Sequence, residues 1–164
     1  MIRYAGQIAM YAVFAATVGL FSVWPGYSML RDDEAIISLT FSHAAKRVGE
    51  CRSLSQEELN ELPPNMRKPN ACPRERHPTY VELRANGNVV FAATLLPSGL
   101  WSDGKANVYY RARLKSGKYE LFVGMNDSGD SRKFDYTLTQ ETEIEPGQNL
   151  VVSFDGSRGS FVIE

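Results

Sequence analysis

The spacing of apolar and polar residues changes once along the chain. Residues 4–30 form a run of 27 positions without Asp, Glu, Lys or Arg. The centre of this run, residues 5–24, is long enough to cross a bilayer core at about 1.5 Å per helical residue. Tyr4 and Trp24 stand at its two ends, where aromatic side chains favour the headgroup level. The pattern predicts a transmembrane anchor helix over residues 1–30.

A cleaved signal peptide is the alternative interpretation of this run. Such a peptide has a shorter apolar region followed by a small-x-small cleavage site. The run ends in Leu-Phe-Ser-Val-Trp-Pro (20–25), which offers no such site and favours a retained anchor. Arg3 precedes the helix, whereas Arg31 is followed at once by three acidic residues. The positive-inside rule therefore places the N-terminus in the cytoplasm and the remainder of the chain outside.

Small residues recur along the predicted helix at spacings of four, three, four and three. This spacing puts them on one helical face, and they are Ala5, Ala9, Ala12, Ala16 and Gly19. Small residues in one stripe let a second helix approach closely, which favours association in lipid. We interpret the stripe as a docking face for a partner helix, although alanine is also common in membrane helices without such a role.

From residue 35 onward the apolar residues recur with a period of two, which predicts short strands. The expected strands cover residues 37–41, 81–85, 89–95, 108–114, 119–125, 134–138, 150–154 and 161–163. Asn86-Gly87 is a strong hairpin signal between two of them. No helical pattern alternates with the strands, so a parallel α/β sheet is disfavoured. The pattern favours an antiparallel immunoglobulin-like β-sandwich over residues 31–164, with a small barrel as the alternative.

One insertion, residues 43–78, interrupts the strands. Ser55 and Glu58 have capping-box spacing and Pro63-Pro64 follows, so a short helix is expected between them. Cys51 and Cys72 are the only cysteines. Outside the cytoplasm they are expected to pair and to close this helical segment into a loop.

Composition limits the range of functions. The chain has 164 residues, of which 43% are apolar and 23% charged, and almost all of the charged residues follow the anchor. The net charge of −1 lacks the basic excess typical of nucleic-acid-binding proteins. The sequence contains no Gly-x-Ser-x-Gly, no His-Glu-x-x-His and no phosphate-binding glycine loop. We therefore expect no enzymatic activity and no cofactor.

Several side chains remain as candidates for binding. Soft sulfur and imidazole ligands suit copper, and the insertion contains His43, Met66 and His77 besides the two cysteines. These residues lack a recognised ligand spacing, so a metal site is not the preferred interpretation. Asn126, Asp127, Asp130 and Asp135 suggest calcium, but such residues are also ordinary in turns. Candidate contacts for a partner are the exposed apolar pair Leu100 and Trp101 and the basic residues Arg67, Lys68, Arg74 and Arg76.

Two segments carry a family resemblance, ISLTFSHAAKRVGECRSLSQEELNELPPNMRKPNACPRER (37–76) and LPSGLWSDGKANVYYRARLKSGKYELFV (96–123). With the preceding anchor, the chain resembles bacterial single-pass inner-membrane proteins that carry an immunoglobulin-like periplasmic domain. The resemblance implies an association with respiratory genes, particularly those of cytochrome oxidases, and carries no catalytic residues.

These observations predict a non-catalytic accessory subunit of a larger integral membrane complex, respiratory by resemblance, which acts in assembly, stability or docking. Two alternatives remain open at this stage. The insertion suggests a periplasmic copper-handling or oxidase assembly factor. The exposed Trp101 and the tyrosines suggest a ligand-binding or carbohydrate-binding sandwich.

Overall fold

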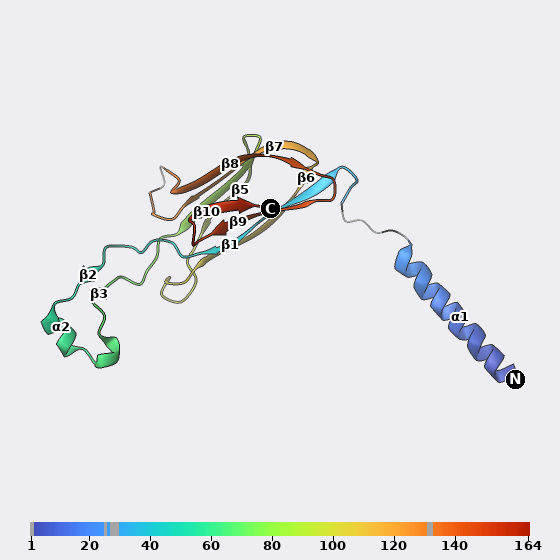
Figure 1. Ribbon diagram of the computed structural model, residues 1–164, viewed down its shortest axis with the longest axis horizontal. Helices are drawn as coiled ribbons and strands as arrows, with labels where there is room; N and C mark the ends of the chain where they lie inside the picture. The colour runs from blue at the N-terminus through green and yellow to red at the C-terminus, as the bar shows by residue number, and fades with distance from the viewer. Residues whose placement is uncertain (1, 25, 27–29, 131–132) are drawn as a thin grey trace. The chain divides into compact units, whose positions relative to one another are not determined.

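The computed structural model describes residues 2–24, 26, 30–130 and 133–164. The chain divides into two units, Met1–Arg31 and Asp32–Glu164. The first unit contains the helix α1 (Ile2–Val23), and the described residues of the second form ten strands and two short helices (Figure 1). The elements of the second unit are β1 (Glu34–His43), β2 (Arg52–Ser53), α2 (Gln56–Glu61), η1 (Pro64–Met66), β3 (Asn70–Ala71), β4 (Thr79–Ala85), β5 (Asn88–Leu95), β6 (Ala106–Lys115), β7 (Gly117–Asn126), β8 (Tyr136–Ile144), β9 (Asn149–Asp155) and β10 (Ser160–Ile163).

Helix α1 has the length and composition of a membrane span. Its apolar segment Tyr4–Val23 has 20 residues, and none of its described side chains is buried within the protein. Thr17 donates its hydroxyl hydrogen to the carbonyl of Val13 at 2.8 Å, so this polar group is satisfied within the helix. The helix is thus suited either to an anchor or to a signal sequence. Pro25, the last residue of the segment 20–25 considered above for a cleavage site, lies outside the described residues.

The second unit is built from two four-stranded sheets. One has the strand order β10-β9-β1-β6 and the other β5-β4-β7-β8, with β2 and β3 forming a separate two-stranded ladder. Neighbouring strands pair antiparallel except for β1 and β9, which run parallel from Ile36↔Asn149 to Leu39↔Val152. The predicted antiparallel β domain is confirmed at this level, and the parallel pair is an addition to it.

Alternate residues of the strands form one core shared by both sheets. Its fully buried side chains include Ile37 and Leu39 from β1, Val81 and Leu83 from β4, Leu121, Val123 and Met125 from β7, and Val152 from β9. These are the apolar positions of the period-two pattern, so each strand turns one face inward and the other outward. Burial of this set supplies the main stabilising term of the domain.

Of two tight turns in the domain, one connects strands within a sheet and the other connects the two sheets. Asn86 and Gly87 have φ angles of +49° and +77°, and they join β4 to β5 in the antiparallel hairpin that the sequence predicts. By contrast, Ser116-Gly117 joins strands of different sheets, because β6 pairs with β1 and β7 pairs with β4. At this crossing Tyr119 donates its hydroxyl hydrogen to the carbonyl of Lys115 at 3.0 Å.

Phe134 lies outside the strand in which the sequence placed it, since β8 begins at Tyr136. Its ring lies over Gly124 of β7, where a Cβ atom would come within 2.8 Å of the ring. The missing side chain at Gly124 therefore makes room for Phe134, and the ring packs on the sheet instead of joining a ladder.

The insertion extends beyond the ends of the sheets and contains β2, α2, η1 and β3 (Figure 1). Ser55 caps α2 with the predicted capping box: its hydroxyl accepts from the Glu58 amide at 3.3 Å, and its own amide donates to the Glu58 carboxylate at 2.8 Å. The disulfide joins Cys51 to Cys72 beside the β2–β3 ladder, as expected. Neither α2 nor η1 has a buried residue, so the disulfide and the cap stabilise a segment that has no apolar core.

Candidate functional site

The small residues of α1 form the first candidate contact surface. Ala5, Ala9, Ala12, Ala16 and Gly19 all lie within the helix and are exposed. At about 100° per residue they occupy an arc of roughly 80° on one side of the helix. The phenylalanines Phe14 and Phe21 project from the opposite side of the same helix. The geometry required for close approach of a second helix is therefore present, and the docking role remains a prediction.

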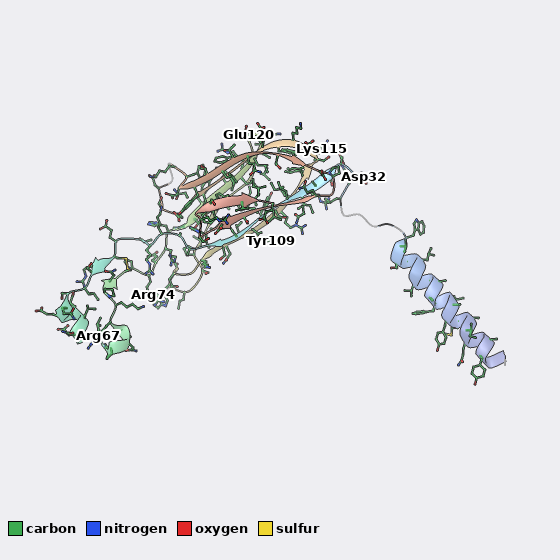
Figure 2. All side chains as sticks on the ribbon, viewed as in Figure 1. Asp32, Arg67, Arg74, Tyr109, Lys115 and Glu120 are labelled. Carbon is green, nitrogen blue, oxygen red and sulfur yellow. A yellow bond between two sulfur atoms is a disulfide. The ribbon has the colours of Figure 1, made fainter. Side chains whose placement is uncertain are left out.

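The second candidate surface lies at the end of the β domain from which the insertion emerges. Figure 2 shows Arg67 and Arg74 on the insertion side of the sheets and Asp32 and Lys115 at the opposite end. The chain enters β1 at Glu34, next to Asp32 and Asp33, and leaves this strand of ten residues at His43. At about 3.3 Å per strand residue, roughly 30 Å separate the entry point from the base of the insertion.

Arg76 holds the two arms of the insertion together at this base. Its Nη1 donates to the carbonyl of Ala45 at 2.6 Å and its Nε to the carbonyl of Asp103 at 2.9 Å. Its backbone amide donates to the carbonyl of Ser102 at 2.9 Å. Arg76 therefore connects the outgoing arm, the returning arm and the loop that contains Trp101, and its guanidinium has a structural role.

Two more of the predicted contact residues also make intramolecular bonds. The guanidinium of Arg74 donates through Nε and Nη2 to one carboxylate oxygen of Asp103, at 3.0 and 2.6 Å. Arg67 donates to the carbonyl of Asn60, in the last turn of α2, and to the carbonyl of Leu62, just after the helix. Such charges stabilise the C-terminal end of a helix. Lys68 is exposed beside Arg67. Most of the predicted basic patch thus supports the insertion and its attachment to the Trp101 loop.

The Trp101 loop (residues 96–105) presents apolar side chains to solvent. Leu100 and Trp101 are 90% and 65% exposed. Gly104 donates its amide hydrogen to the carbonyl of Ser98 at 2.8 Å, and a Cβ atom on Gly104 would lie only 2.2 Å from the Ser98 hydroxyl oxygen. The contact between Ser98 and Gly104 closes the loop around residues 99–103. The exposure of Leu100 and Trp101 therefore follows from the conformation of this closed loop.

A charged cluster around the buried Asp127 lies beneath the insertion. Nε2 of His43 is 2.8 Å from Oδ2 of Asp127, and Nζ of Lys46 is 3.2 Å from Oδ1 of Asp127 and 3.3 Å from Oδ1 of Asp135. The Asp127 side chain is only 3% exposed. The ring of His43 packs edge-on against Phe154, with the centroids 5.0 Å apart. This cluster, which we call the base cluster, joins β1, β9, the start of the insertion and the segment between β7 and β8.

Electrostatics at the base cluster favour the ionised form of Asp135. Burial of Asp135 opposes ionisation, but hydrogen bonds from Ser128, from the amide of Asp127 and from Lys46 outweigh it and lower its pKa to about 2. Desolvation lowers the pKa of Lys46, but hydrogen bonds and charge attraction to the Asp127 and Asp135 carboxylates outweigh it and raise that pKa. The cluster is thus a structural network of opposite charges between the insertion and the sheets.

The residues considered for metals are distributed over different elements. His43 bonds to Asp127, His77 packs against Gly129, and Met66 lies in η1 on the insertion. The cysteines form the disulfide. Within the part of the chain that the structure describes, no group of three or more His, Cys, Asp or Glu residues is arranged to hold a metal ion.

The calcium candidates make turn interactions. The Asn126 side chain donates to the carbonyls of Asp130 and Lys133, both at 2.6 Å, and accepts from the amide of Gly129. Asp135 accepts from the amides of Asp127 and Ser128. The segment after β7 is therefore a loop held by its own side chains.

Two residues of these sites were missed by the sequence reasoning. Lys46 bonds to Asp127 and Asp135, which lie 81 and 89 positions away along the chain. Asp103 bonds to Arg74 and Arg76, which lie 29 and 27 positions away. Local pattern carries no signal for such pairs. No protein-family model, curated protein or solved structure matches the chain.

Proposed function

We propose that this chain is a non-catalytic, membrane-anchored accessory subunit of a larger integral membrane complex, acting in assembly, stability or docking. One observation carries the proposal: the insertion and the exposed Leu100–Trp101 pair are joined at the end of the β domain opposite to the chain entry. The joint consists of Arg74 and Arg76 bonds to Asp103. We call the Leu100–Trp101 pair, which these bonds hold in place, the apolar tip. An exposed apolar pair at the end of the domain opposite to the chain entry suits contact with a neighbouring protein.

Helix α1 supplies the attachment in this proposal. It is retained as a single-pass anchor in a bacterial inner membrane, with the N-terminus cytoplasmic and the β domain periplasmic. The absence of a small-x-small site at residues 20–25 supports retention, and the disulfide fits an oxidising compartment. The stripe from Ala5 to Gly19 would contact a helix of the partner complex.

We further infer that the β domain is immunoglobulin-like. In immunoglobulin domains the second and fifth strands pair in one sheet, and the other sheet of variable-type domains has the order C′-C-F-G. The pair β1–β6 and the order β5-β4-β7-β8 fit this arrangement. The bond from Tyr119 to the Lys115 carbonyl, at the start of β7, fits the tyrosine corner of such domains. Strands β9 and β10 would then occupy the position beside β1 that the first strand usually takes.

The partner class comes from the family resemblance, which favours a respiratory complex such as a cytochrome oxidase. The test is affinity purification of the full chain from native membranes in a mild detergent, with identification of the co-eluting proteins. We expect an integral membrane complex to co-purify. A chain that elutes alone, or a mature chain that begins after Trp24, would overturn the proposal.

Matched variants separate the two contact surfaces. Ala12→Leu/Ala16→Leu fills the small-residue face, and Phe14→Leu/Phe21→Leu alters the opposite face as a control. Leu100→Ser/Trp101→Ser removes the apolar tip, and Tyr109→Ser removes an equally exposed aromatic side chain from β6. We expect loss of co-purification with the first variant of each pair and retention with its control.

A further inference from the structure

A cavity lies on the face of the β5-β4-β7-β8 sheet that is turned away from the core. Its volume is about 540 Å³, within the range of small-molecule sites. Its walls come from β4, β5 and the segment that follows β7, and they include His77, Tyr80, Glu82, Arg84, Lys133 and Phe134. None of these residues belongs to the Trp101 loop or to the small-residue face of α1, so the cavity is separate from the surfaces of the proposed function.

Glu82 is a buried carboxylate beside this cavity. Tyr80, Glu82 and Arg84 occupy the alternate positions of β4 that face away from the core, yet Glu82 is only 6% exposed. One of its oxygens accepts from Nε of Arg84, and the other accepts from the hydroxyl of Tyr80 at 2.8 Å. Burial opposes its ionisation, but these two bonds hold the pKa of Glu82 below its usual value.

Aromatic rings form the apolar wall of the cavity. The ring of Phe134 stacks on Tyr80 with the centroids 6.1 Å apart and meets Phe122 edge-on at 5.6 Å. Gly124 lies beneath Phe134 and in register with Glu82. The wall is therefore a ring surface placed over a sheet position that has no side chain.

The charges that face the cavity favour an anion. Both oxygens of Glu82 already have partners, so its carboxylate is compensated by Arg84. Arg84 uses Nε for this bond and packs over Phe122, and within the described residues its two Nη nitrogens have no hydrogen-bond partner. Lys133 adds a second positive charge to the lining. A guanidinium held by one edge presents its other donors in the geometry that suits a carboxylate.

We propose that this cavity binds a small organic anion with a planar, apolar body, such as an aromatic carboxylate. The carboxylate accepts hydrogen bonds from the Nη nitrogens of Arg84, and the planar body packs against Tyr80 and Phe134. Glu82 acts as a positioning residue, since it orients the guanidinium without contacting the ligand. A cationic ligand is disfavoured because Arg84 already binds the Glu82 carboxylate and covers the ring face of Phe122, the two groups that would attract a cation.

The test is a ¹⁹F NMR titration of the full chain in detergent micelles with 4-fluorobenzoate. Parallel titrations use 4-fluorobenzyl alcohol and 4-fluorobenzylamine, which keep the ring but carry no charge or a positive charge. We expect saturable binding of the benzoate and at least about tenfold weaker binding of the other two probes, because a charge-assisted pair is lost. Equal binding of all three probes, or no saturable binding of the benzoate, would overturn the proposal.

Two variants locate the binding. Arg84→Lys keeps the positive charge but loses the pair of parallel N–H donors that a guanidinium presents to a carboxylate. We expect about tenfold weaker binding of the benzoate. Thr94→Phe places a large side chain in the cavity, opposite Tyr80 on the neighbouring strand, and it should abolish binding. Thr139→Phe, at an exposed position of β8 outside the lining, is the matched control. Unchanged binding in Thr94→Phe, with a normal thermal melt, would place the benzoate elsewhere and contradict the assignment.

Discussion

Nε2 of His43 lies 2.8 Å from Oδ2 of Asp127, and this contact joins the end of β1 to the segment after β7. The two residues are 84 positions apart, and the strands that end at or just before them, β1 and β7, belong to opposite sheets of the domain. The Asp127 carboxylate is buried, and Lys46, on the first arm of the insertion, contacts its other oxygen. The base cluster therefore fixes the insertion to both sheets at one point.

Removal of the Asp127 charge is expected to destabilise the domain. Asp127→Asn removes the carboxylate that faces His43 and leaves Lys46 with Asp135 alone, and loss of a buried hydrogen-bonded partner costs about 1–3 kcal/mol. The free energy of unfolding from urea titration measures the effect. Asp103→Asn is the control: its partner Arg74 is exposed, so the expected loss is below about 1 kcal/mol. Equal losses for both variants would contradict a structural role specific to the base cluster.

Acid should weaken the same cluster through Asp135. The pKa of Asp135 in the folded protein, about 2, lies below its ordinary value of 3.8. Because the folded-state value is the lower one, the stabilisation is complete above about pH 5 and is lost as the pH falls from 4 towards 2. The difference corresponds to about 2 kcal/mol.

Urea unfolding at a series of pH values checks this prediction against Asp135→Asn. The variant should be less stable than the wild type at pH 7, and the two should converge as the pH approaches 2. A constant difference between them across the whole range would show that Asp135 acts through packing alone.

The disulfide is expected to protect the insertion more than the sheets. In the chain-entropy model, closing a loop of this size contributes about 3 kcal/mol. The double change Cys51→Ser/Cys72→Ser should therefore open the insertion, because α2 and η1 have no buried residues. Limited trypsin digestion should then cut rapidly after Arg67, while circular dichroism still reports the strands. Rapid cleavage within β4 or β7 instead would show that the disulfide also supports the core.

Tyr119 is expected to stabilise the crossing between the two sheets. Tyr119→Phe deletes the hydroxyl that donates to the Lys115 carbonyl, at an expected loss of about 1 kcal/mol in the free energy of unfolding. Tyr109→Phe removes the hydroxyl of a tyrosine whose side chain is exposed on β6, and it should leave stability unchanged. Thermal melts compare the two variants with the wild type. A lower melting temperature for Tyr119→Phe alone would support the prediction, and equal melting temperatures for both variants would contradict it.

Local features of this fold could be predicted from the sequence because neighbouring residues determine them. The capping box at Ser55 and the hairpin at Asn86-Gly87 depend on residues within a few positions of each other. The period-two pattern predicted the buried faces of β1, β4 and β7 in the same way. The pairing of two lone cysteines needed no spatial information.

Features that depend on distant partners were not predictable in this way. The pattern of Phe134 matches a strand, but the glycine that accommodates its ring is ten positions away on another strand. The basic residues of the insertion looked like a free surface, since Asp103 lies 27 or more positions beyond Arg74 and Arg76. Likewise, an outward-facing glutamate at position 82 has the pattern of a solvated residue, and only its neighbours make it buried.

The parallel pairing of β1 with β9 has a consequence for the order of folding. β1 occupies an inner position of its sheet, and one of its two neighbours is supplied by residues 149–155. During synthesis, β1 must therefore wait with an open hydrogen-bonding edge until residues 149–155 have been made. Unpaired strand edges invite association with other chains. Premature termination before residue 149 would thus leave β1 with an unpaired edge that is prone to aggregation.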